Sequence, residues 1–145
     1  MVFHSVDELK QYIISRSGSA LQQAIEQVYQ IIDRFVKEFY GEFSPEMYER
    51  TYQLYTSLVK TGVQSTGSGW KAEVYFDYSS LSYMTGSQPS GIQVMGAAAH
   101  GGHGAEGLHI ESGGTAIWDE PITILQTEAI EILKKMLIAN GIPIR

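Results

Sequence analysis

Three histidines lie close together in the chain and are the side chains best suited to chemistry. His100, His103 and His109 carry imidazoles, which are common zinc ligands, and three of them would complete most of a zinc shell. Their spacing matches no standard helical or hairpin ligand pair, and Glu106 and Glu111 are the only carboxylates nearby. Two interpretations stay open: a metal site, or polar histidines on a loop. We favour the loop, so we expect neither a metal nor another cofactor.

Other catalytic patterns are weaker. Residues Gly102 to Gly107 formally match Gly-x-Gly-x-x-Gly, but an alanine run precedes them and no helix start follows, so the pattern does not predict a dinucleotide site. The chain has no Gly-x-Ser-x-Gly elbow and no phosphate-binding Gly-x-x-x-x-Gly-Lys loop. The acidic pairs Asp7-Glu8 and Asp119-Glu120 stand at expected helix starts, where the helix dipole accounts for them. We therefore expect no enzymatic activity.

The composition is that of a folded domain. The 145 residues are 43% hydrophobic and 18% charged, which is enough for a single domain with its own core. With no cysteine, the chain can form neither a disulfide nor a thiolate metal site. The net charge is -6 and the largest basic cluster is Lys134-Lys135, so we expect no specific nucleic-acid binding. No apolar run is long enough to span a membrane, and Asp7 and Glu8 stand where a signal peptide would be basic, so we expect no membrane partner.

Two helices are expected in the first part of the chain. Ser5 and Glu8 form a capping box, which predicts a helix over residues 6–16 with an apolar stripe of Val6, Leu9 and Ile13. The run Ser17-Gly18-Ser19 predicts a break. A second helix is expected over 20–40, with Gly41 as its stop. Its expected buried stripe is Leu21, Ala24, Ile25, Val28, Ile32, Phe35, Val36 and Phe39.

The middle of the chain predicts one strand between loops. Ser44-Pro45-Glu46 predicts a short helix of one or two turns, followed by irregular chain to Gly62. The stretch Gly62–Gly69 predicts a flexible loop. Residues 70–77 then alternate, with Trp70, Ala72, Val74 and Phe76 on the face expected to be buried.

The last third predicts a long loop and a helix. Residues 85–107 are rich in Gly, Ala and Ser and predict a loop, and 108–118 predict a weak hairpin. The final helix is expected over 121–140, ended by Gly141 and Pro143. Its expected buried stripe is Ile122, Leu125, Ala129, Ile132, Leu133, Met136 and Leu137. The elements together predict a single α+β domain: long amphipathic helices packed on a small, mainly antiparallel sheet, with a long Gly-rich loop.

Two isoleucines of the final helix suggest a second contact surface. Ile124 and Ile138 fall on the side of this helix opposite its expected core stripe. Aligned apolar side chains on an otherwise solvated face are typical of an interface. We therefore expect this helix to contact another subunit.

One motif resembles a known family. Tyr48, Arg50, Thr51, Leu54 and Ser57 form a Tyr-x-Arg-Thr-x-x-Leu-x-x-Ser pattern between the long helix and the strand. From Phe3 to about Asp77 the chain resembles the minor tail-component and neck (head–tail joining) proteins of long-tailed bacteriophages. Many of these relatives have glycine directly after the Arg-Thr pair, where this chain has Tyr52.

The resemblance implies a structural role in a virion. It implies a ring homo-oligomer that contacts other neck or tail proteins, with DNA passing through the ring without specific binding. Assembly would take place in the host bacterial cytoplasm. Arg50, Tyr52 and Tyr55 are then candidates for the contact between subunits, because arginine and tyrosine are enriched in interfaces. A second interpretation of Arg50 stays open, in which it ties this segment to the long helix of its own chain, for instance through Glu38 or Glu42.

Two other functions stay open. One is a small metal-binding domain or metal-dependent enzyme that uses His100, His103 and His109. The other is a cytosolic protein-binding module that uses the long helix and the tyrosines. Elemental analysis of the purified protein separates the first from a virion protein, and the size of the assembly separates the second.

Overall fold

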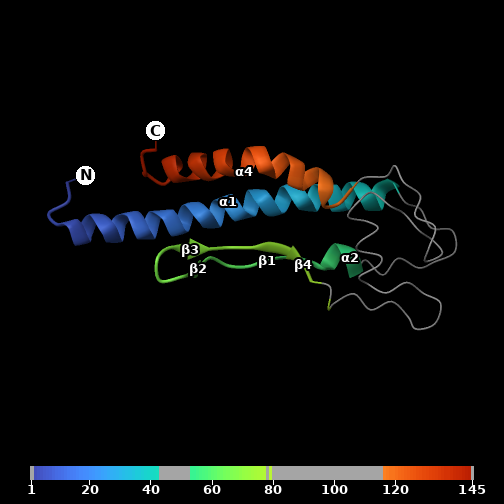
Figure 1. Ribbon diagram of the computed structural model, residues 1–145, viewed down its shortest axis with the longest axis horizontal. Helices are drawn as coiled ribbons and strands as arrows, with labels where there is room; N and C mark the ends of the chain where they lie inside the picture. The colour runs from blue at the N-terminus through green and yellow to red at the C-terminus, as the bar shows by residue number, and fades with distance from the viewer. Residues whose placement is uncertain (1, 43–52, 78, 80–115, 145) are drawn as a thin grey trace.

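The long helix α1 (Val6–Glu42) is the central layer of the molecule. The computed structural model describes residues 2–42, 53–77, 79 and 116–144. Helix α4 (Asp119–Ala139) lies along one side of α1, and a β-ribbon lies along the opposite side (Figure 1). The expected α+β class is confirmed, with antiparallel strands and two long helices. No helix in the described ranges is long and apolar enough to cross a membrane.

The predicted capping box starts α1. The amide of Glu8 donates to Ser5 Oγ at 3.1 Å, and Glu8 Oε2 in turn accepts from the amide of His4 at 2.8 Å. The first bond satisfies an amide that the first turn of a helix leaves without an intrahelical acceptor, and the second ties the residue before the cap to the helix. The first turn is therefore held helical although it lies at the end of the molecule (Figure 1).

The predicted break after residue 16 is wrong. The expected helices 6–16 and 20–40 are one continuous helix that ends at Glu42, one residue beyond Gly41. Ser17 Oγ donates to the carbonyl of Ile14 at 2.9 Å, and Ser19 Oγ donates to that of Ser15 at 3.4 Å. Both hydroxyls donate to carbonyls three or four residues earlier in the same helix, as serines in a helix interior often do, so neither serine caps a helix end.

Gly18 has a packing role within this helix. The indole of Trp70 lies against it, and a Cβ on Gly18 would be 3.0 Å from Trp70 Cε2. Trp70 Nε1 donates to the carbonyl of Ile14 at 2.8 Å. The glycine that local propensity marks as a helix breaker thus provides the space for a tryptophan that arrives later in the sequence.

The ribbon is one long hairpin with a bulge. Strand β1 (Leu58–Lys60) pairs with β4 (Val74–Phe76), and β2 (Gln64–Ser65) pairs with β3 (Trp70–Lys71). Lys60 is opposite Val74 and Gln64 is opposite Lys71, so positions 61–63 face only positions 72 and 73. One extra residue on the first strand is a β-bulge, and it separates the two ladders.

The expected strand over 70–77 is therefore partly right. Its alternation is confirmed: Phe76 is 5% exposed while Tyr75 is 44% exposed. Its continuity is wrong, because the bulge interrupts it at 72–73. The segment expected to be irregular up to Gly62 contains β1, and the expected loop Gly62–Gly69 contains β2 and a tight turn with Gly67 at φ 83°. The segment up to Gly62 also contains a single helical turn, α2 (Gln53–Thr56), beyond the short helix expected to start at Ser44.

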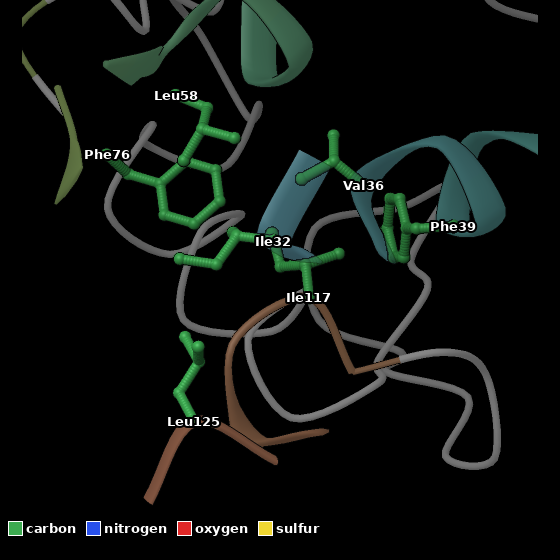
Figure 2. Packing of buried hydrophobic residues seen from close by; sticks show 7 residues of the cluster. All are labelled: Ile32, Val36, Phe39, Leu58, Phe76, Ile117 and Leu125. Carbon is green, nitrogen blue, oxygen red and sulfur yellow. The ribbon is translucent and has the colours of Figure 1, made fainter. Parts of the chain in front are cut away.

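One apolar cluster joins the three layers (Figure 2). The predicted stripe of α1 is confirmed, with Ile32 at 1% and Val36 at 0% exposure. The ring of Phe76 meets that of Trp118 edge-on, with centroids 5.8 Å apart. The buried members of the cluster are Ile32, Val36, Phe39, Leu58, Phe76, Ile117 and Leu125.

The expected final helix is confirmed within two residues at its start and one at its end. The amide of Ile142 donates to the carbonyl of Leu137 at 2.9 Å and that of Gly141 to Ile138 at 3.0 Å, with Gly141 at φ 84°. This is a Schellman motif, and it turns the chain away from the helix axis. The expected helix start at Ser44-Pro45, the loop 85–107 and the hairpin residues 108–115 lie outside the described residues.

Candidate assembly surfaces

Several predicted site residues lie outside the described part of the chain. These are the three histidines, His100, His103 and His109, and two of the interface candidates, Arg50 and Tyr52. Among the residues that the structure describes, no group of three or more His, Asp or Glu side chains could hold a metal ion.

Tyr55 is partly used within its own subunit. It is half-buried on α2 and packs against the apolar cluster. Lys37 Nζ lies 6.0 Å from the centroid of its ring, and the same ammonium pairs with Asp33 at 2.6 Å. The hydrogen bond to Asp33 is the main cause of the raised pKa of Lys37. This arrangement keeps a cation beside the tyrosine ring at the surface of α1.

The two predicted isoleucines of α4 differ in exposure. Ile138 is 56% exposed, whereas Ile124 is half-buried and lines a hollow of about 390 Å³ with Phe35. A third isoleucine of α4, Ile130, is 65% exposed. It belongs to neither of the stripes expected on α4, so periodicity gave no signal for it.

The hairpin leaves the outer edges of two strands without a described partner strand. The amide of Asp77 donates to the carbonyl of Ser57 at 2.7 Å, and the amide of Thr61 donates to that of Glu73 at 2.8 Å. Because backbone groups alternate in direction along an antiparallel strand, these odd-numbered positions point inwards. The amides and carbonyls of Leu58 and Lys60 on β1, and of Val74 and Phe76 on β4, therefore point outwards at the two edges.

Lys60 fixes the hairpin to α1. Its ammonium pairs with the carboxylate of Glu26 and lies 4.8 Å from the ring centroid of Tyr29. The hydrogen bond from Lys60 is the main cause of the lowered pKa of Glu26. Burial raises the pKa of the Tyr29 hydroxyl. The orientation of β1 on the helix thus depends on an exposed ion pair over an aromatic ring.

A second hollow lies between α1 and the ribbon beside Trp70. Its volume is about 670 Å³. Among the described residues its polar lining consists of neutral amides and hydroxyls, contributed by Gln11, Ser15, Ser19, Gln22 and Gln23. The indole donor of Trp70 is already bonded to α1. The hollow therefore presents no titratable group for acid–base chemistry.

The first turns of α1 carry exposed apolar side chains. The sequence predicted Val6, Leu9 and Ile13 as one stripe, and the structure leaves them 81%, 38% and 43% exposed. Phe3 and Tyr12 are nearby, with ring centroids 5.2 Å apart. This stripe is thus an apolar surface that the described part of the fold does not cover.

The fold and these surfaces define a small α+β protein with features suited to contacts with other chains: two strand edges without a partner strand in the described part of the chain, exposed isoleucines on α4 and an apolar helix end. A family model named YomN matches residues 5–139, and the chain belongs to the YomN family. The family name derives from a Bacillus phage or prophage, which indicates a phage-related protein. No curated protein and no solved structure matched the chain.

Proposed function

We propose that this protein is a structural component of a tailed-phage virion: a ring-forming neck, head–tail joining or minor tail protein. The edges of β1 and β4, which have no partner strand among the described residues, are the observation that carries the proposal. Unpaired edges of this kind are a template for pairing with another chain. The phage association of the family and the resemblance of the Tyr48–Ser57 region to neck and tail proteins support the setting.

The edges suggest how the ring forms. The edge of β1 in one subunit pairs with the edge of β4 in the next, so that the antiparallel order of the ribbon continues from subunit to subunit. Such a head-to-tail contact uses different patches on the two partners, and it closes into a ring when the rotation per subunit fits. Arg50, Tyr52, Tyr55 and the exposed side of α4 add contacts to neighbouring subunits or to other neck and tail proteins.

The ring would enclose an axial channel for DNA. The net charge of the chain is -6, and an acidic wall repels the phosphate backbone. DNA would then slide through without specific binding, in a virion assembled in the host cytoplasm. In this role the protein needs neither a catalytic group nor a cofactor.

Two variants at Lys60 test the edge pairing. The Lys60 amide points outwards, so Lys60→Pro removes a donor at the open edge without removing a bond inside the hairpin. Lys60→Ala is the matched control, because both variants lose the ion pair with Glu26 and only proline removes the amide. We expect Lys60→Ala to assemble into rings and Lys60→Pro to stay folded but form no ring.

Light scattering after size exclusion and negative-stain electron microscopy measure the outcome, and circular dichroism checks that both variants are folded. The proposal fails if the wild-type protein forms no ring even with its neck or tail partners present. Equal ring formation by folded Lys60→Pro and Lys60→Ala would show that the contact does not use this edge.

A further inference from the structure

The face of α1 that packs on α4 follows a repeat of seven residues. We call this face the seam, and it consists of two series of positions, each spaced by seven residues. One series is Val6, Ile13, Ala20 and Gln27, and the other is Leu9, Arg16 and Gln23. The contacts locate this seam against α4. Gln27 Nε2 is 3.6 Å from Met136 Sδ, Asn140 Nδ2 donates to Gln23 Oε1 at 3.3 Å, and Ala20 is fully buried.

Helix α4 covers only part of this seam. It ends at Ala139, and the Schellman motif at Gly141 turns the chain away. Helix α1 extends beyond that point at its N-terminal end (Figure 1). The seam continues there with Ile13, Leu9 and Val6, which are 43%, 38% and 81% exposed. An established helix–helix interface therefore continues onto a surface without a described partner.

The uncovered segment is already helical without a partner. The hydrogen bonds between Ser5, Glu8 and His4 cap its first turn, and the helix runs on without a break through Gly18. When the helix is already formed, binding does not include the conformational-entropy cost of ordering it. The exposed stripe of Val6, Leu9 and Ile13 can therefore pack against a partner helix without first folding.

We propose that the seam over Val6 to Arg16 binds the same segment of a second copy of this chain, with the two helices antiparallel. Antiparallel helices pair the two series of a seven-residue repeat with each other. Leu9 of each copy then packs against Ile13 of the other, and Val6 packs against the aliphatic part of Arg16. The segment is its own complement in this register.

The charges of the segment also favour the antiparallel arrangement. At 100° per residue, Glu8 and Arg16 lie on the same flank of the seam, near its two ends. Antiparallel pairing brings Glu8 of one copy beside Arg16 of the other, twice, whereas parallel pairing places the two Arg16 side chains of the seam opposite each other. On the other flank Asp7 and Lys10 are three positions apart and offset each other's charge within one helix.

This contact does not depend on the proposed function. It has two-fold symmetry and is complete with two copies, so it cannot build a ring by itself. The stripe is small compared with stable interfaces, so the dimer is weak and forms at high protein concentration.

The apolar part of the contact is tested by Leu9→Gln combined with Ile13→Gln. Sedimentation velocity over a wide concentration range measures the monomer–dimer equilibrium of the whole chain. We expect the double variant to raise the dissociation constant at least about a hundredfold, since four apolar side chains leave the contact. Its thermal midpoint should equal that of the wild type, because these side chains lie outside the described core. Ile130→Gln, the same change at an exposed isoleucine of α4, is the control and should leave the dimer intact.

A charge exchange tests the orientation. Arg16→Glu and Glu8→Lys should each weaken the dimer severalfold, and the two together should restore it. All variants are also measured in the Lys60→Pro background, where ring formation through the strand edge is removed and the dimer should persist. A Lys60→Pro protein that stays monomeric at high concentration would overturn the proposal, as would a dimer that survives Leu9→Gln/Ile13→Gln. Failure of the combined charge variant to recover would overturn the antiparallel register.

Discussion

Gly18 sets how closely the ribbon approaches the central helix. No side chain can be added there without moving the indole of Trp70, whose nitrogen is bonded to the carbonyl of Ile14. Gly41, near the other end of the same helix, has no atom within 4 Å of the position that a Cβ would take. The same substitution at the two glycines therefore distinguishes the effect of packing against Trp70 from the effect of helix propensity.

We predict that Gly18→Val destabilises the protein by about 1–3 kcal/mol, because the added methyl groups overpack the contact with Trp70. Gly41→Val should stay within about 0.5 kcal/mol of the wild type, as is usual for surface changes. Urea unfolding followed by circular dichroism measures both. Equal stability of the two variants would mean that the indole moves aside without cost.

Local sequence could not reveal this role of Gly18. The run Ser17-Gly18-Ser19 has the composition of a helix break, and propensity is the only information that a short window contains. The reason for a continuous helix lies at Trp70, which is distant in sequence. In contrast, the capping box at Ser5 and Glu8 and the stop at Gly141 were predictable, because each depends on residues within one turn.

At the scale of elements, the hairpin is held to α1 by packing, by the hydrogen bond from Trp70 Nε1 to the carbonyl of Ile14 and by an ion pair. Lys60 of β1 pairs with Glu26 of α1 beside the ring of Tyr29. Since the hydrogen bond from Lys60 lowers the pKa of Glu26, the ionised carboxylate is favoured in the folded state. The stabilisation from this group is present above its ordinary pKa of 4.5 and is lost as the pH falls through the lower folded value.

We predict that Glu26→Gln flattens the acid side of the stability profile. The thermal midpoint of the wild type should fall as the pH is lowered below 4.5, and that of the variant should fall less. Glu128→Gln, at an exposed position of α4, is the control and should follow the wild type. High salt should reduce the difference, because the pair is exposed. Parallel curves for wild type and Glu26→Gln would show that the pair does not contribute.

In the hairpin, the alternation along one strand was predictable from sequence, whereas the register between the two strands was not. The alternation over 70–77 follows from side-chain direction along one strand, and it was predictable. The bulge at 61–63 depends on the register between two strands, which one strand does not encode. The open edges follow from the same pairing, so this candidate surface needed the structure.

At the scale of the whole molecule, α1 packs on both sides and leaves α4 with one face towards solvent. Of the two isoleucines in the contact surface predicted on α4, Ile138 is exposed and Ile124 is half-buried beside Phe35, and the contact itself stays a prediction. The exposed apolar end of α1 was not predictable, because an apolar stripe looks the same whether its partner is in the same chain or in another.

We predict that Ile124→Lys combined with Ile138→Lys leaves a folded protein and abolishes or weakens ring formation. Lysine at position 124 can extend its ammonium out of the hollow, and position 138 is already exposed. Gln126→Lys with Ala139→Lys adds two charges at other exposed positions of α4 and should leave assembly unchanged. Light scattering after size exclusion measures the mass. A double isoleucine variant that assembles like the wild type would exclude this face of α4 from the contact.

The central position of α1 has a consequence for the order of events during synthesis. The hairpin follows α1 closely in sequence, so these two layers can form as soon as the ribosome has released them. Helix α4 is the last element, and the α4-facing seam of α1 stays uncovered until it emerges. The nascent chain therefore passes through a stage in which the whole seven-residue repeat of α1 is open to other chains. Synthesis on neighbouring ribosomes would favour pairing of α1 segments at that stage, before α4 limits the contact to the first turns.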